Sequence, residues 1–190
     1  MTTDNLSLMR QARETLRGKW GLPIATCLVY TLLTGGLGSD RHGGSIISLI
    51  ITGPLQLGLA TFSLTLSRGG NASFQQLFNG FNYFVKALAT YLLMVLYIVL
   101  WMLLLIVPGI IAALSYAMTF YILADDISLE PQQALDKSKK MMDGHKVKLF
   151  YLCLRFLLLA LLCVLTLGIG FLWFIPFVNV IMAKFYDDIK

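Results

Sequence analysis

Arg155 is the one charged side chain that the sequence places inside an apolar helix, so it is the first candidate for chemistry. It lies about two turns into a predicted membrane helix over about 148–166. A long side chain at that depth can extend its charge to the membrane interface. The alternative is that Arg155 binds a lipid phosphate or an anionic ligand, because charges within the membrane usually serve function. Lys139 and Lys140, in the preceding polar segment, are further candidates for contact with lipid or anion.

Catalytic and metal-binding motifs are missing from the sequence. All ten Asp and Glu lie in polar segments, so no carboxylate is predicted within the membrane for a proton relay. His42 and His145 are predicted on opposite sides of the membrane, and no CxxC, HExxH or GxSxG occurs. Cys27, Cys153 and Cys163 lie in apolar blocks, where we expect small core residues. We therefore predict no catalytic residue, no metal and no cofactor, and a protein that is not an enzyme.

The composition predicts the elements that must position these side chains. The chain is 57% hydrophobic and 13% charged, against roughly 45–50% and about 25% in soluble domains. Its apolar residues form blocks that match the roughly 20 residues a transmembrane helix needs. The sequence therefore predicts an all-α membrane protein, with residues 1–190 as a single polytopic domain. Six transmembrane helices are expected, at about 20–36, 46–66, 84–107, 110–124, 148–166 and 170–185.

Positive charge predicts the orientation of these helices. Thirteen of the fifteen Lys and Arg lie in the segments 1–19, 67–86, 125–148 and 184–190. Short loops rich in Lys and Arg mark the cytoplasmic side, so both termini are expected there. Acidic residues interleave with the basic run at 137–148, so we expect no nucleic-acid partner.

Proline and glycine predict where the helices turn or break. The run from Ala87 to Ala124 holds no charge and is too long for one crossing. Pro108 and Gly109 are predicted to turn the chain at the outer surface, which Trp101 would also mark. The competing interpretation is a hairpin that crosses only partly and is buried among the other helices. Further turns or helix breaks are predicted at Gly53, Pro54, Gly168 and Gly170.

Three glycines at a regular spacing predict an internal repeat. Gly18, Gly80 and Gly144 are 62 and 64 residues apart. Each would end an amphipathic cytoplasmic helix and lead into a helical hairpin, giving three hairpins in pseudo-threefold arrangement. The units are about 1–66, 67–127 and 128–190.

The amphipathic helices are expected either in the headgroup layer or packed against the ends of the membrane helices. Ser128 is predicted to cap the third of them, and Asn71 or Ser73 the second. Their apolar faces are predicted to be Leu6, Met9, Ala12 and Leu16, then Phe74, Leu77, Phe78 and Phe81, then Leu135, Ser138 and Met142.

Four segments of the chain resemble a bacterial family of small integral membrane proteins. They read "GPLQLG", "IVPGIIAALSYAM", "SKKMMDGHKVKLF" and "LGIGFLWFIPF…AKFY". That family is catalogued only as a domain of unknown function, and it is distantly similar to the membrane domain of some glycerophosphodiester phosphodiesterases. The resemblance implies six helices in a bacterial cytoplasmic membrane. It supplies no catalytic residues, and the chain has no room for the hydrolase barrel.

These observations favour a non-enzymatic membrane protein that acts through partners. The expected partners are membrane lipids and either another membrane protein or further copies of this chain. Such a protein would be accessory to export, to envelope maintenance or to resistance against membrane-active peptides. The main alternative is a small transporter or channel with a path between the hairpins, and a third possibility is an enzyme acting on lipid.

Overall fold

The structure is a computed structural model that describes residues 4–36, 44–166 and 168–190. Every regular element in these ranges is a helix, so the predicted all-α class is confirmed. The first elements are α1 (Asn5–Leu16), α2 (Gly21–Gly36), α3 (Gly44–Ser67), α4 (Gln76–Asn79) and the 3₁₀-helix η1 (Gly80–Tyr83). They are followed by α5 (Phe84–Leu104), α6 (Ile106–Tyr116), α7 (Thr119–Asp125), α8 (Pro131–Met141), α9 (Lys146–Leu165) and α10 (Phe171–Ile189).

Four helical stretches are long and apolar enough to cross a membrane. They are Ser48–Ser67, Gln76–Leu104, Ile106–Asp125 and Lys146–Leu165, and the shorter Gly21–Gly35 is also apolar. Outward faces of α5 and α9 are apolar along their length, as expected where helices meet lipid. On α9 the exposed side chains include Tyr151, Leu154, Leu158, Leu161 and Leu165. The length of these helices and their apolar surfaces are compatible with a membrane protein.

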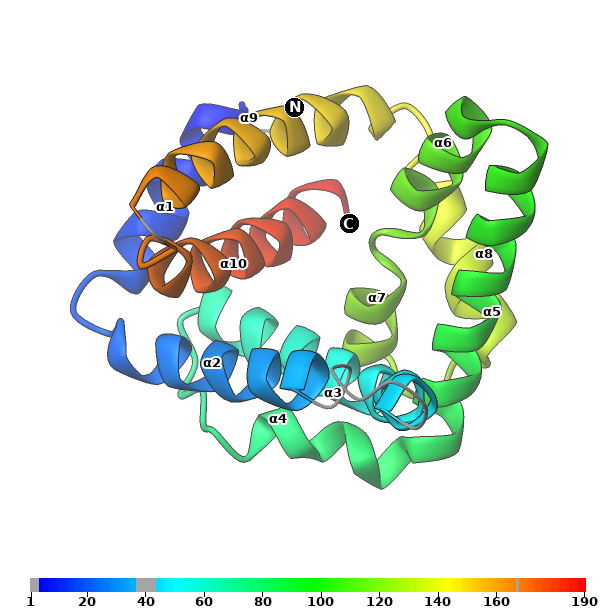
Figure 1. The fold of residues 1–190 in the computed structure, drawn as a ribbon, viewed down its shortest axis with the longest axis horizontal. Helices are drawn as coiled ribbons and strands as arrows, with labels where there is room; N and C mark the ends of the chain where they lie inside the picture. Colours follow the sequence, from blue (N-terminus) through cyan, green and yellow to red (C-terminus); the bar gives the residue numbers. More distant parts are fainter. Residues whose placement is uncertain (1–3, 37–43, 167) are drawn as a thin grey trace.

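The core lies where α3, α7 and α10 meet. In Figure 1, α10 lies between α9 on one side and α2 and α3 on the other, while α5, α6 and α8 lie together away from α1. Phe62 of α3, Ile122 of α7 and Phe185 of α10 are almost fully buried in one cluster. Because α3 also packs against α2, α4 and α5, it is the central helix of the bundle.

Three glycines allow α3 to pack closely against the segment that enters α5. A Cβ added at Gly58 would lie 1.9 Å from the carbonyl oxygen of Leu77, and one at Gly80 would lie 1.9 Å from that of Pro54. Gly53 faces the backbone of Ala87 in the same way, at 2.9 Å. Small residues at helix crossings permit this approach in membrane proteins.

This packing corrects the predicted roles of three of these residues. Gly53 and Pro54 lie inside α3, which continues through them, so the break predicted there is wrong. Gly80 has a helical φ of −60° and the chain continues into η1, so it does not end a helix as predicted. Gly18 and Gly144 do end their helices, each with a φ of +79°, a conformation that glycine adopts without strain.

The turn after α5 lies earlier than predicted. Leu105 alone is extended, with φ −163° and ψ 147°. Pro108 follows in the first turn of α6, where its missing N–H costs nothing, and Gly109 packs against Met102 of α5. The expected return helix over 110–124 is also two helices, because it is interrupted between Tyr116 and Thr119.

The predicted turn at Gly168 and Gly170 is confirmed. Gly168 has a φ of +86°, and Gly170 is the N-cap residue of α10. Pro176 lies inside α10 without ending it. Of the three cysteines only Cys27 is a buried core residue, since Cys153 is exposed on α9 and Cys163 is half-buried, which corrects the prediction for both.

The residues predicted to form the buried faces of the amphipathic segments agree with the structure in one segment and only partly in another. Leu135 and Ser138 of α8 and its C-cap residue Met142 are fully buried as predicted. The cap of α8 is Glu130, which forms a capping box with Gln133, and not Ser128. The set predicted for α1 is wrong in part, because Leu6 is exposed and the buried residues are Asn5, Leu8, Ala12 and Leu16.

The second amphipathic segment is shorter than predicted. Its helical turn begins only at Gln76, with Gln75 as the N-cap residue, so neither Asn71 nor Ser73 caps it. Leu77 is buried, whereas Phe74, Phe78 and Phe81 are partly exposed and form a row of ring contacts that ends at Phe84. The internal repeat itself stays a prediction.

Candidate functional site

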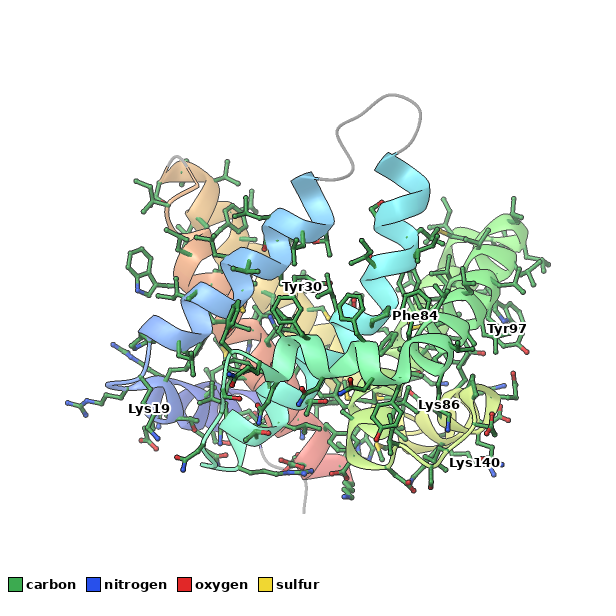
Figure 2. The ribbon with its side chains drawn as sticks, turned by 90° about the horizontal axis from the view of Figure 1, so that it is seen from below. Lys19, Tyr30, Phe84, Lys86, Tyr97 and Lys140 are labelled. Carbon is green, nitrogen blue, oxygen red and sulfur yellow. The ribbon has the colours of Figure 1, made fainter. Side chains whose placement is uncertain are left out.

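The hairpin of α5 and α6 lies along the polar helix α8. The hydroxyl of Tyr97 donates to Gln132 Oε1 at 3.2 Å, and the ammonium of Lys86 donates to the carbonyl oxygen of Ile127 at 3.0 Å. Leu135 of α8 packs with Tyr116 in a small buried cluster. Figure 2 shows Lys86, Tyr97 and Lys140 on this side of the molecule.

Packing against α8 places the tip of this hairpin near the charged side chains of Lys139 and Lys146. Trp101 and Pro108, expected at the outer boundary, line the same pocket as Lys139 and Lys146 of the predicted cytoplasmic segment. Both placements cannot hold in one membrane, because its hydrocarbon core is about 30 Å thick. The structure therefore does not separate Trp101 from these lysines by the thickness of a membrane.

Two adjoining pockets at this place form the candidate site. One is mainly apolar, with a volume of about 150 Å³. The other is charged, with a volume of about 370 Å³. Lys139 and Lys146 line both pockets, so the two lie side by side. The apolar pocket is completed by Trp101, Pro108, Ile111, Ala112, Ser115 and Tyr116, and the charged one by Asp136, Lys140 and Asp143.

The lysines are held in place by the buried face of α8. Ser138 is fully buried, and its hydroxyl donates to the carbonyl oxygen of Ser115 at 2.8 Å. This bond ties α8 to α6 one residue before Lys139. Gly144 then turns the chain, and α9 begins at Lys146. Lys139 and Lys146 are therefore brought together by two helices and a tight turn.

The site is suited to holding an anion beside an apolar group. Three lysines and two aspartates line the charged pocket, which leaves an excess of positive charge. No side chain in the described chain caps the start of α9, so the positive end of the helix dipole adds to this field. Lys139 and Lys140 were both predicted as contacts for lipid or anion, and the structure brings both to this pocket.

Arg155, the third predicted contact, does not line either pocket. It lies nine residues beyond Lys146 on α9, or about 13 Å along the helix. Its Nη1 atom is buried without a hydrogen-bond partner among the described residues. The guanidinium is thus neither fully extended into water nor paired, and its predicted role in binding stays a prediction.

Another pocket, of about 180 Å³, lies among α3, α5, α6, α7 and α10 and is lined mostly by apolar side chains. Gln56 and Asn179 line it together with Tyr116 and Tyr121. Tyr30, labelled in Figure 2, donates a hydrogen bond to Gln56 Oε1 at 3.1 Å. Sequence reasoning missed this cavity, although an amide side chain within an apolar run was a signal.

An ionic cluster joins the ends of α3, α7 and α10. Arg68 binds Asp125 and Asp187, each at 2.7 Å, and Lys190 also binds Asp125. A hydrogen bond to Asp187, and to a lesser extent one to Asp125, raises the pKa of Arg68 above its ordinary value. All these charges are matched within the protein, so the cluster stabilises the helix ends and is not a ligand site. Among the described residues, no group of His, Cys, Asp and Glu could hold a metal ion.

Comparison with known proteins identifies the family but no characterised relative. Neither the curated proteins nor the solved structures contain a match to this chain. A family model described as "Protein of unknown function (DUF975)" matches residues 1–115 and 102–190. Because these matches extend over the whole chain, the protein belongs to this family of unknown function.

Proposed function

We propose that the protein is a non-enzymatic integral membrane protein that acts through lipid or protein partners. The observation that carries this proposal is the pocket of Lys139 and Lys146, which opens beside exposed apolar side chains of the α5–α6 hairpin. It combines positive charge with an apolar wall, which is what an amphiphilic partner needs. The hydroxyl residue of this pocket, Ser115, donates to the carbonyl oxygen of Ile111 at 2.7 Å, and this bond within its own helix favours binding over catalysis.

The proposed location is the cytoplasmic membrane of a bacterium, with both termini and the basic segments on the cytoplasmic side. The α2–α3 and α9–α10 hairpins would cross the membrane. The α5–α6 hairpin is long and apolar enough to cross, but we place it as a partial hairpin that enters from the cytoplasmic side and returns, because its tip lies near the lysines. This proposal replaces the six full crossings that the sequence favours by four crossings and one partial hairpin.

Cysteine labelling tests this topology. In a variant without native cysteines, Val107→Cys marks the tip of the α5–α6 hairpin, and Ile169→Cys marks the turn between α9 and α10. Both residues are exposed, at 67% and 60%. A maleimide that cannot cross membranes should label position 169 but not position 107 in intact cells. Labelling at both positions would show that the α5–α6 hairpin crosses completely.

Isolation in native membrane patches tests the function. The protein is extracted with a polymer that retains surrounding lipid, and then transferred stepwise to mild detergent. Lipid or protein that stays bound through this transfer at a fixed ratio supports the proposal. Removal of every partner at the first detergent step would contradict it.

The pocket lined by Gln56 and Asn179 favours a second candidate function, which is transport of a small polar solute. Gln56 and Asn179 offer hydrogen bonds there, and polar groups inside a membrane bundle often mark a pathway. Ala113 and Ala117 also line the cavity, so Ala113→Leu should fill it. A flux of small neutral solutes into liposomes that Ala113→Leu abolishes would support transport, and absence of any flux in the wild type would oppose it.

A further inference from the structure

We infer that the pocket of Lys139 and Lys146 binds an anionic phospholipid, with the phosphate between the lysines and an acyl chain against Trp101 and Ile111. This inference rests on the proposed function, because it names the partner that the site takes. It depends on three features of the described residues, which are the lysines shared by the two pockets, the apolar wall beside them and the start of α9.

The charge of the pocket selects the headgroup. Lys139 and Lys146 come from different helices and line the same space, so one phosphate can contact both. Each lysine near an anionic lipid surface raises affinity by a factor of about five. Asp136 and Asp143 line the same pocket and reduce this gain. They would bind the ammonium group of a zwitterionic lipid, so selectivity for anionic lipid depends on the excess of lysine.

The apolar wall selects a lipid over a soluble phosphate. Trp101, Ile111 and Ala112 line the half of the site that adjoins the lysines. Beyond it, the tip of the hairpin exposes Leu103, Leu104, Leu105, Ile106 and Val107. An acyl chain would therefore continue from the pocket along an apolar surface. A free phosphate or glycerol phosphate lacks the chain and would gain only from the lysines.

The experiment uses the full-length protein in nanodiscs of a neutral phospholipid with a small fraction of phosphatidylglycerol. Native mass spectrometry then counts the phosphatidylglycerol molecules that stay bound after the protein is released from the nanodisc. The test variant is Lys139→Gln/Lys146→Gln. The control is Lys137→Gln/Lys19→Gln, which removes the same charge from exposed positions outside both pockets. Helicity and thermal unfolding verify that all variants fold.

We expect the test variant to bind phosphatidylglycerol about 25-fold more weakly, from about fivefold for each lysine. The control should bind like the wild type. Equal loss in both variants would mean that net charge alone attracts the lipid, and would overturn the site. Retention of lipid by the wild type with no change in the test variant would overturn the inference and leave the proposed function standing. If the wild type retains neither lipid nor protein, the proposed function itself fails.

A second pair of variants tests the acyl-chain wall. Ile110 and Ile111 are similarly exposed, at 43% and 47%, but only Ile111 lines the pocket. Ile111→Ser should weaken phosphatidylglycerol binding, and Ile110→Ser should not. Soluble glycerol phosphate added in excess should fail to compete. Full competition by glycerol phosphate would show that the site binds the phosphate alone, and would overturn the lipid assignment.

Discussion

Gly58→Ala offers the sharpest test of how the bundle is packed. The added Cβ would lie 1.9 Å from the carbonyl oxygen of Leu77 and 2.5 Å from its carbonyl carbon. An ordinary contact begins at about 3.4 Å, so α3 and α4 would have to separate by about 1.5 Å. A flexible side chain could rotate away from the new methyl group, but both atoms here belong to the backbone.

This separation should be costly. Overpacking a tightly packed contact costs about 1–3 kcal/mol, and we expect a value near the upper end because neither backbone can yield locally. The separation would also disrupt the close contact between Gly80 and Pro54, which meet at the same helix crossing. Leu77 and Leu55, both fully buried beside it, would lose contact as the helices part.

The assay is reversible unfolding of the purified protein in mixed micelles of dodecyl maltoside and SDS, followed by helicity. Gly35→Ala is the matched control, since a Cβ at this helical glycine meets nothing within 4 Å. Its unfolding free energy should stay the same or rise by up to about 1 kcal/mol. Equal stability of the wild type and Gly58→Ala would refute the close approach of α3 and α4.

Three further predictions concern the polar contacts between helices. Arg68→Gln should lower the free energy of unfolding by about 1 kcal/mol at low salt and by less at high salt, because the two ion pairs that it breaks are partly exposed. Thermal unfolding at both salt concentrations measures this effect, and a loss that does not depend on salt would contradict the prediction. Gln133→Ala should cost about 1 kcal/mol by opening the capping box of α8, whereas Lys137→Ala on the exposed face should be neutral in the same measurement. Tyr97→Phe and Gln132→Ala should show a coupling energy of about 0.5–1.5 kcal/mol in a double-mutant cycle, and additive losses would mean that α5 does not pack against α8 through this bond.

Much of the secondary structure follows from the sequence alone. Apolar blocks, proline and glycine predict most helix boundaries to within a few residues, because a helix that meets lipid must be apolar over its length. The αL turns at Gly18, Gly144 and Gly168 are likewise local, since only glycine adopts a positive φ without cost. The buried face of α8 follows from its 3.6-residue period.

The arrangement of those helices was decided only by tertiary contacts. Periodicity shows which face of a helix is apolar, but not which partner covers it. The closeness of Gly58 to Leu77, and of Gly80 to Pro54, depends on two helices crossing at those residues. The same holds for the candidate site. Lys139 was predicted to face an anion, but its neighbour Trp101 was expected at the far side of the membrane. Packing of α8 along α5 brings them together. The free energy of this packing depends on how well two helix surfaces fit each other, and these surfaces are far apart in the sequence.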